Sequence, residues 1–135
     1  MDFFSAMNIS ASGLAAERSR VDAAASNLAN ADATRGPDGK PYKRIDPILA
    51  SRPFENDMNA TAVEVVGMAQ SQSEGRKVYS PGHPDADGDG FVTLPDVNPI
   101  HETVNLISAS KAYDANASAI ETLKTMAQRA LDIAK

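Results

Sequence analysis

The residues best suited to chemistry stand in an acidic stretch near the middle of the chain, where carboxylates recur at alternate positions. Their spacing fits a calcium-binding loop, in which oxygen ligands converge on one hard cation from a tight turn. The matching positions are 1, 3, 5 and 12 for the acids and 6 for the glycine: Asp85, Asp87, Asp89, Asp96 and Gly90. The stretch therefore raises the hypothesis of a calcium-dependent binding module.

Three features of the same stretch speak against calcium. Asp96 stands where a bidentate Glu is usual, and its side chain is shorter. The entering segment 80–84 is rich in Pro and Gly, and Pro95 and Pro99 interrupt the exit, so no helix–loop–helix pair is expected. The alternative interpretation is an acidic, solvated turn between two strands.

The inventory for catalysis is poor. His83 lies in a Pro/Gly turn, and His101 with Glu102 is expected in a first helical turn, where we predict a capping and solvated role. No nucleophile elbow, phosphate-binding glycine loop or zinc-binding histidine pair occurs. We therefore expect neither an enzyme nor a cofactor.

Composition favours a protein that associates. The 135 residues include 23 Ala and seven aromatic residues, so a lone monomer buries little apolar area. A net charge of −5 argues against nucleic acid or an anionic membrane surface as the partner. There is no Cys, no apolar run long enough to span a membrane, and no signal peptide is expected.

The C-terminal segment, 98–135, predicts one long helix. Asn98 is a good N-cap and Pro99 suits the first helical position, and no Pro or Gly follows. One apolar stripe runs along it, with Asn116 as a polar member that could fix register. The stripe comprises Leu106, Ala109, Tyr113, Asn116, Ile120, Leu123, Ala127, Ala130 and Ala134.

The N-terminal segment, 1–30, predicts a second helix from about Phe3 to Asn30. Its stripe recurs at helical spacing and comprises Phe4, Met7, Ala11, Leu14, Val21, Ala25 and Leu28. Gly13 in the interior is either a tolerated weak point or a site of close helix approach.

Residues 31–97 differ in character, because they hold seven of the eight Gly and seven of the eight Pro. We expect short extended pieces over 42–49, interrupted by Pro47, and a strand over 61–70. Two shorter strands are expected over 76–79 and 91–94. These form a small β-hairpin insert.

The predicted fold class is therefore mainly α with a small β insert: two long antiparallel terminal helices, coiled-coil-like, with a short β-hairpin domain between them at one end. Such a helical hairpin leaves apolar stripes uncovered, which indicates neighbouring subunits.

With these residues in view, the chain resembles the flagellar axial proteins, the family of rod and hook subunits. The resemblance rests on segments at both ends and in the middle, in the family's order. The segments are Ser10–Arg18, Ser26–Ala31, Val78–Asp87, Gly90–Val92, Pro95–Asn98, Val104–Asn116 and Leu131–Ile133. The family varies in the acids of the middle loop, which favours a solvated turn over calcium.

The resemblance implies a structural subunit of the bacterial flagellar basal-body proximal rod. Its partners would be other rod proteins and copies of itself. It would leave the cytoplasm through the flagellar type III export apparatus, without a cleaved signal peptide, and assemble in the periplasm through its terminal helices. The expected assembly residues are Leu14, Val21, Asn27, Leu28, Asn30, Leu106, Tyr113, Asn116, Ile120 and Leu123.

Overall fold

The structure is a computed structural model that describes residues 3–54 and 57–133. Two long helices at the ends of the chain enclose four strands, which confirms the expected fold class. The elements in chain order are α1 (Phe3–Ala29), β1 (Ile45–Phe54), β2 (Asp57–Gln70), β3 (Arg76–Tyr79), β4 (Phe91–Leu94) and α2 (Pro99–Ile133).

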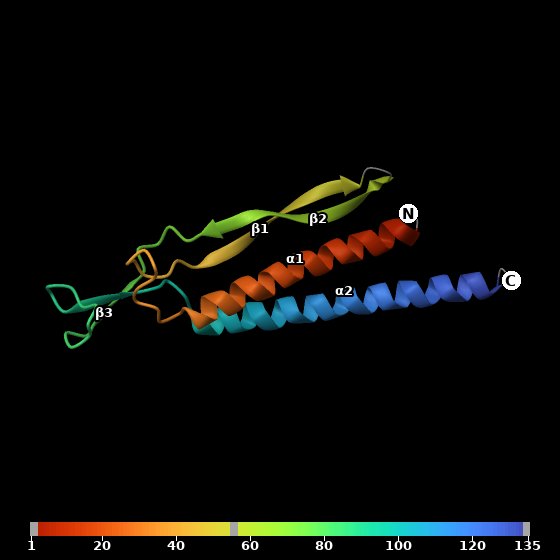
Figure 1. Ribbon diagram of the computed structural model, residues 1–135. Helices are drawn as coiled ribbons and strands as arrows, with labels where there is room; N and C mark the ends of the chain where they lie inside the picture. The colour runs from red at the N-terminus through yellow and green to blue at the C-terminus, as the bar shows by residue number, and fades with distance from the viewer. Residues whose placement is uncertain (1–2, 55–56, 134–135) are drawn as a thin grey trace.

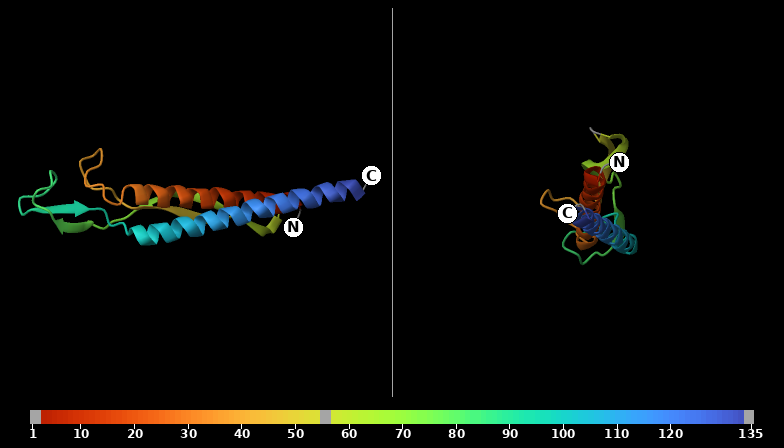
Figure 2. Two further views of the ribbon diagram at one scale, coloured as in Figure 1. Left: turned by 90° about the horizontal axis from the view of Figure 1, so that it is seen from below. Right: turned by 90° about the vertical axis from the view of Figure 1, so that its right-hand side faces the viewer.

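The molecule is elongated, and α1 is its middle layer. The antiparallel α2 packs along one side of α1, and the β1–β2 hairpin lies along the other side (Figure 1). Both ends of the chain lie at the same end of the molecule, where α2, with 35 residues, extends beyond α1, with 27 (Figure 2). Among the described helices and strands, α2 packs on α1 alone.

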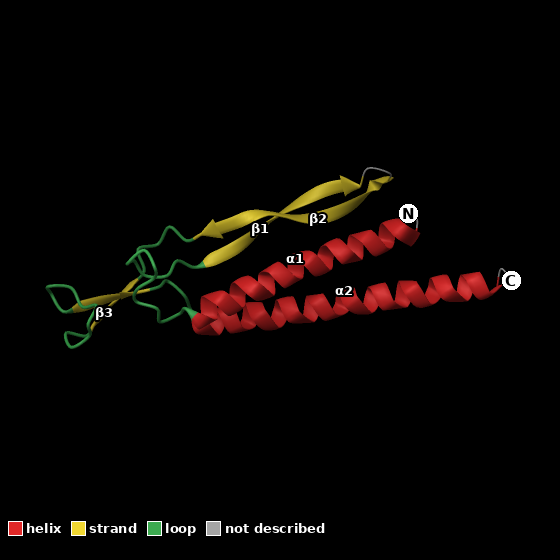
Figure 3. Cartoon of the chain, viewed as in Figure 1, coloured by secondary structure: helices red, strands yellow, loops and turns green. Residues whose placement is uncertain are grey.

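The prediction that the β insert lies at one end of the helical pair is wrong for the longer hairpin, β1–β2. Only the small β3–β4 sheet projects from the end of the helical pair, whereas β1 and β2 run beside α1 (Figure 3). Two small residues of β2, Ala60 and Ala62, are buried, and the backbone N–H of Val63 donates to the Ser12 hydroxyl of α1 at 3.1 Å. Small side chains on both elements allow this close approach.

The strand β1 is also longer and more continuous than expected. It runs through both Pro47 and Pro53 and pairs antiparallel with β2. A proline removes one N–H donor, which is tolerated where a strand is an edge strand, and each strand of a two-stranded sheet is an edge strand. Because of this, the prolines do not interrupt β1.

The shorter strands, β3 and β4, lie where the sequence predicts them and pair over their full length, from Arg76 opposite Leu94 to Tyr79 opposite Phe91. Gly75, just before β3, has φ of +90°, and a Cβ atom there would stand 2.3 Å from the carbonyl oxygen of Leu94. Glycine is therefore required where β3 begins beside the end of β4.

The start of α2 is also as predicted. The side-chain oxygen of Asn98 accepts the backbone N–H of Ile100 at 3.0 Å and that of His101 at 3.4 Å. These bonds satisfy two of the donors that a helix leaves unpaired at its N-terminus.

The buried apolar core consists of alanines and two valines: Ala16, Ala23, Ala24, Ala31, Ala60, Ala62, Ala109, Val92 and Val97. The accessible surface is 9178 Å². A compact monomer of this mass would expose about 6,800 Å². The molecule thus exposes roughly a third more surface than a globule, with a core too small to bury its larger apolar side chains.

Two contacts fix the register of α1 against α2. Asn27 bonds Glu102, and a Cβ atom on Gly13 would lie 3.0 Å from the Asn116 side-chain nitrogen. Both contacts are separated by 14 residues in each helix, which is two heptads, so one face of each helix stays against the other. Of the two interpretations of Gly13, the structure supports close helix approach.

We predict that Gly13→Ala stabilises the fold only when Asn116 is shortened. In an Asn116→Ala background, Gly13→Ala should raise the free energy of unfolding by about 0.5–1 kcal/mol through helix propensity. In the original sequence that gain should be lost, because the new methyl group crowds the Asn116 amide. Urea unfolding of the four variants measures both effects, and an equal effect in both backgrounds would show that the two residues do not meet.

Candidate functional site

A cluster of hydrogen-bonded polar side chains lies where α1 ends, β1 begins and α2 begins. Its centre is Asn27, which is fully buried. The amide nitrogen donates to the carbonyl oxygen of Ile45 at 2.8 Å and to Glu102 at 3.1 Å. The amide oxygen accepts the backbone N–H of Ile45 and the hydroxyl of Tyr42, both at 2.9 Å. All four hydrogen-bonding positions of this amide are therefore filled.

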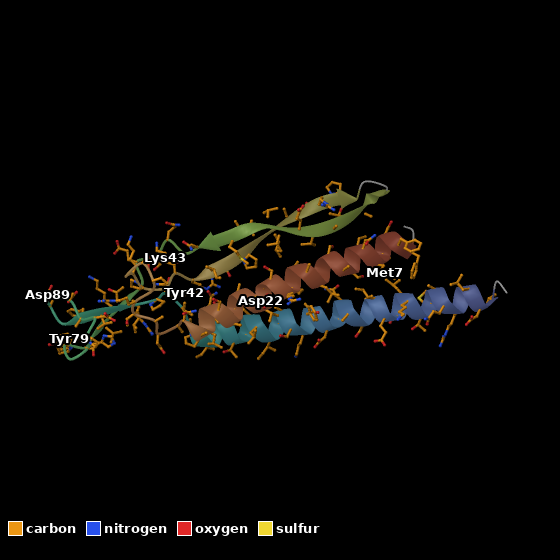
Figure 4. The ribbon with its side chains drawn as sticks, in the orientation of Figure 1. Met7, Asp22, Tyr42, Lys43, Tyr79 and Asp89 are labelled. Carbon is orange, nitrogen blue, oxygen red and sulfur yellow. The ribbon has the colours of Figure 1, made fainter. Side chains whose placement is uncertain are left out.

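Asn27 binds the first residue of β1 as a neighbouring strand would, through both its N–H and its C=O. The end of α1 thereby sets where β1 starts. Tyr42, which Figure 4 labels at this junction, also lies 3.2 Å from the Ser26 hydroxyl, which holds its ring against α1.

The second half of the cluster is an ion pair. Glu102, from the first turn of α2, is 1% exposed, and its second oxygen accepts from the Arg44 guanidinium at 2.7 Å. Arg44 also bonds Asp46. We call Asn27, Tyr42, Arg44 and Glu102 the polar clasp, because together they join both helices to the hairpin. Within the described residues, no buried side-chain polar atom is left without a partner.

The surroundings of Arg44 favour the charged form of its guanidinium. Burial acts to lower the pKa of its guanidinium, but hydrogen bonds and attraction from Glu102 and Asp46 outweigh burial and raise that pKa above its ordinary value. The raised pKa means that the bonds of the Arg44 guanidinium to Glu102 and Asp46 stabilise the folded state fully at neutral pH. This stabilisation is lost only as the pH rises through the pKa of the guanidinium.

The prediction that Glu102 is a solvated first-turn acid is wrong. Its neighbour His101 is exposed, but Glu102 faces α1 and is among the largest fully buried side chains. A signal in the sequence could have found it, since Glu102 stands seven residues before Ala109 and 14 before Asn116, on the same heptad position. The residue type gives the opposite signal, because carboxylates are rarely buried without a partner, and the partner Arg44 is distant in sequence.

The acidic loop adopts the turn that was the alternative to a calcium site. Asp85 bonds Thr34 at 2.8 Å and Arg35 at 2.6 Å, and one oxygen of Asp87 accepts the backbone N–H groups of Asp89 and Phe91. Asp89 lies at the tip in Figure 4, and both Asp89 and Asp96 are exposed. Over residues 3–54 and 57–133, no group of three or more His, Cys, Asp and Glu side chains is placed to hold a metal ion.

The other predicted assembly residues lie along the helical pair. Asn30 caps α1 by donating its amide to the carbonyl oxygen of Ser26 at 2.8 Å. Tyr113 is 37% exposed. The remaining seven are half-buried: Leu14, Val21, Leu28, Leu106, Asn116, Ile120 and Leu123. Buried Asn27 serves the chain's own register, whereas contact of the others with a neighbour stays a prediction.

Sequence reasoning missed a second apolar stripe on α2. Ile100, Val104 and Ile107 are 73%, 60% and 50% exposed. At about 100° per residue they share one face, which lies opposite the face that carries the buried Glu102 and Ala109. The helix thus has one apolar face against α1 and another open to solvent. No described helix has an apolar stretch that would let it cross a membrane.

The structure therefore defines an elongated subunit built on two terminal helices, and comparison with known proteins names its class. A family profile described as "Flagella basal body rod protein" matches residues 7–37. Another, described as "Flagellar basal body rod FlgEFG protein C-terminal", matches residues 89–133. The first match covers most of α1 and the second covers α2, and both profiles describe flagellar rod proteins.

Full-length relatives identify the family more narrowly. The chain is 38% identical over 133 residues to the flagellar basal-body rod protein FlgC of Salmonella typhimurium, covering 98% of each chain. It is 38% identical to FlgC of Borreliella burgdorferi, again over 98% of each, and 36% identical to FlgC of Bacillus subtilis over 100% of each. The chain belongs to the FlgC family of flagellar basal-body rod proteins.

We predict that Asn27→Ala is among the most destabilising single changes in the chain. It removes four hydrogen bonds and leaves one oxygen of the buried Glu102 and the backbone N–H and C=O of Ile45 without their Asn27 partner. The free energy of unfolding should therefore fall by about 2–4 kcal/mol. Asn30→Ala, which removes a single hydrogen bond to the carbonyl oxygen of Ser26, is the matched control and should cost about 1 kcal/mol. Urea titration measures both, and equal losses would contradict the clasp.

We also predict that Arg44→Ala lowers the free energy of unfolding because it leaves the buried Glu102 carboxylate without a cation. Arg44→Ala should cost about 2–4 kcal/mol, reduced from a fully buried pair because part of the guanidinium reaches solvent. Adding Glu102→Gln should restore part of that loss, since a neutral amide is cheaper to bury. If the second change instead deepens the loss, Glu102 does not need a cation.

Proposed function

We propose that this chain is a structural subunit of the flagellar basal-body rod, assembled there with copies of itself and with other rod proteins. The observation that carries the proposal is the identity of 38% to a rod protein over 98% of both chains. A likeness of this length retains both terminal helices and the segments between them in one order, so it carries more weight than a shared motif.

The physical character of the chain supports the same function. Its surface of 9178 Å² exceeds that of a compact monomer by roughly 2,400 Å². A standard interface buries about 800 Å² on each partner, so a subunit with several neighbours could cover this excess. Exposed apolar residues on α2, such as Ile100 and Val104, provide apolar area whose burial against a neighbour is favourable.

Assembly into a rod requires contacts that do not close into a small ring. Helical growth uses contacts between unlike surfaces, repeated from one subunit to the next. A rod that transmits torque needs these contacts to be wide and close-packed. Long helices rich in Ala allow close approach along many turns, and we propose that Leu14, Val21, Leu28, Tyr113, Ile120 and Leu123 contribute to them.

We further propose export through the flagellar type III apparatus and assembly in the periplasm. An unfolded passage is favoured by a core of alanines and two valines, which limits the free energy of unfolding. The chain has no cysteine, so no disulfide opposes unfolding before export. A structural role in a rod involves no catalysis, so the proposed function is not enzymatic.

We predict that Ile120→Asp prevents incorporation into rods and abolishes motility. The change places a charge on the half-buried stripe of α2, and burying that charge against a neighbouring subunit should cost more than a pair with the exposed Lys124, one turn further along, regains. Ser118→Asp, at an exposed position on the same helix, is the matched control and should be incorporated. Both variants are expressed in a bacterium lacking its own rod subunit, and detergent-extracted basal bodies are probed for the chain. Normal motility with Ile120→Asp would contradict the proposed use of this face.

A further inference from the structure

A groove runs along the seam between α1 and α2, with a volume of about 290 Å³. Val21 and Tyr113 form its apolar part, and the exposed acids Asp22 and Asp114 stand beside them. The complete lining is Arg18, Val21, Asp22, Ser110, Tyr113 and Asp114. The groove is therefore an apolar slot whose edges carry two acids and one base.

The open face of α2 has the complementary form. Ile100, Val104 and Ile107 make a ridge over two turns, and the exposed Lys111 stands one turn further along the same face. We call these four residues the ridge. Among the described helices and strands, none packs on these apolar side chains, because the face of α2 that meets α1 lies on the opposite side.

We propose, on the basis of the rod function above, that the ridge of one subunit lies in the groove of a second copy of this chain. Lys111 of the ridge would then lie beside the acids of the groove, Asp22 and Asp114. The groove is also the outer edge of the α1–α2 contact, so a third helix seated there continues that packing at the usual interaxial distance of about 8–10 Å.

The pairing of unlike surfaces explains how a single chain could extend an assembly. Each copy carries both a ridge and a groove, so a copy whose ridge is occupied keeps its groove open for another. Such contacts grow an open assembly instead of a closed dimer. Charge complementarity sets the direction, because a ridge with Lys111 fits an acidic groove better than it fits another ridge.

Disulfide crosslinking tests the contact directly, since the chain has no cysteine of its own. Purified Ile107→Cys and Val21→Cys chains are mixed and oxidised, because Ile107 is one turn from Lys111 and Val21 is next to Asp22. Lys77→Cys, exposed on β3, is the control partner. Heterodimers should exceed either homodimer by about fivefold or more, because disulfides need Cα atoms within about 7 Å. Yields no higher than with Lys77→Cys would overturn the proposal.

Charge exchange provides a second test that does not rely on crosslinking. Lys111→Glu and Asp22→Lys should each abolish self-association in sedimentation, and a mixture of the two should restore it, since each supplies the charge that the other needs. Lys77→Glu has the same change of charge as Lys111→Glu and should retain association. A mixture that stays monomeric, or an equal loss with Lys77→Glu, would overturn the proposal.

The same cysteines in basal bodies separate this inference from the rod function. Cells expressing both variants should yield rods in which the two chains are joined. Rods that contain the chain but no such link would overturn the ridge-and-groove contact and leave the rod function intact. A link from either cysteine to a different rod protein would have the same meaning. Basal bodies without the chain would contradict both.

Discussion

The fold depends on one saturated amide. Asn27 fills all four of its hydrogen-bonding positions, and in doing so it fixes the end of α1, the start of β1 and the first turn of α2 together. Apolar contacts alone could not do this, because a stripe of alanines tolerates sliding by a turn with little loss. Directional bonds to a buried group are costly to leave unmade, so they select one register.

The composition explains why polar groups carry this role. The largest fully buried side chains are Glu102, Asn27 and Pro95, whereas the other buried apolar residues are alanines and two valines. Burial of an Ala methyl stabilises by less than about 1 kcal/mol, so the core supplies close approach more than free energy. Replacing a buried ion pair by apolar groups is often neutral or stabilising. The value of the clasp therefore lies in specifying the arrangement of the three elements.

The sequence predicted correctly the features that depend on residues close together in the chain. The cap by Asn98, the extent of both helices, and the strands 76–79 and 91–94 follow from residues close in sequence, and all are observed. Glu102 was misread because its partner Arg44 is 58 positions away. The hairpin beside α1 was also missed, since its packing depends on Ala60 and Ala62 meeting small residues of α1, and alanine gives no strong periodic signal.

The division of α2 into two apolar faces links the fold to its use. The inner face is already occupied by α1 and held in register at Glu102 and Asn116, so it presents the outer face in a fixed orientation. An outer ridge on a helix free to rotate or slide would meet a neighbour in many ways, and repeated contacts would not build a regular rod. The clasp that orders one subunit therefore also determines where the ridge at Ile100, Val104 and Ile107 stands. Order within the subunit is the condition for order between subunits.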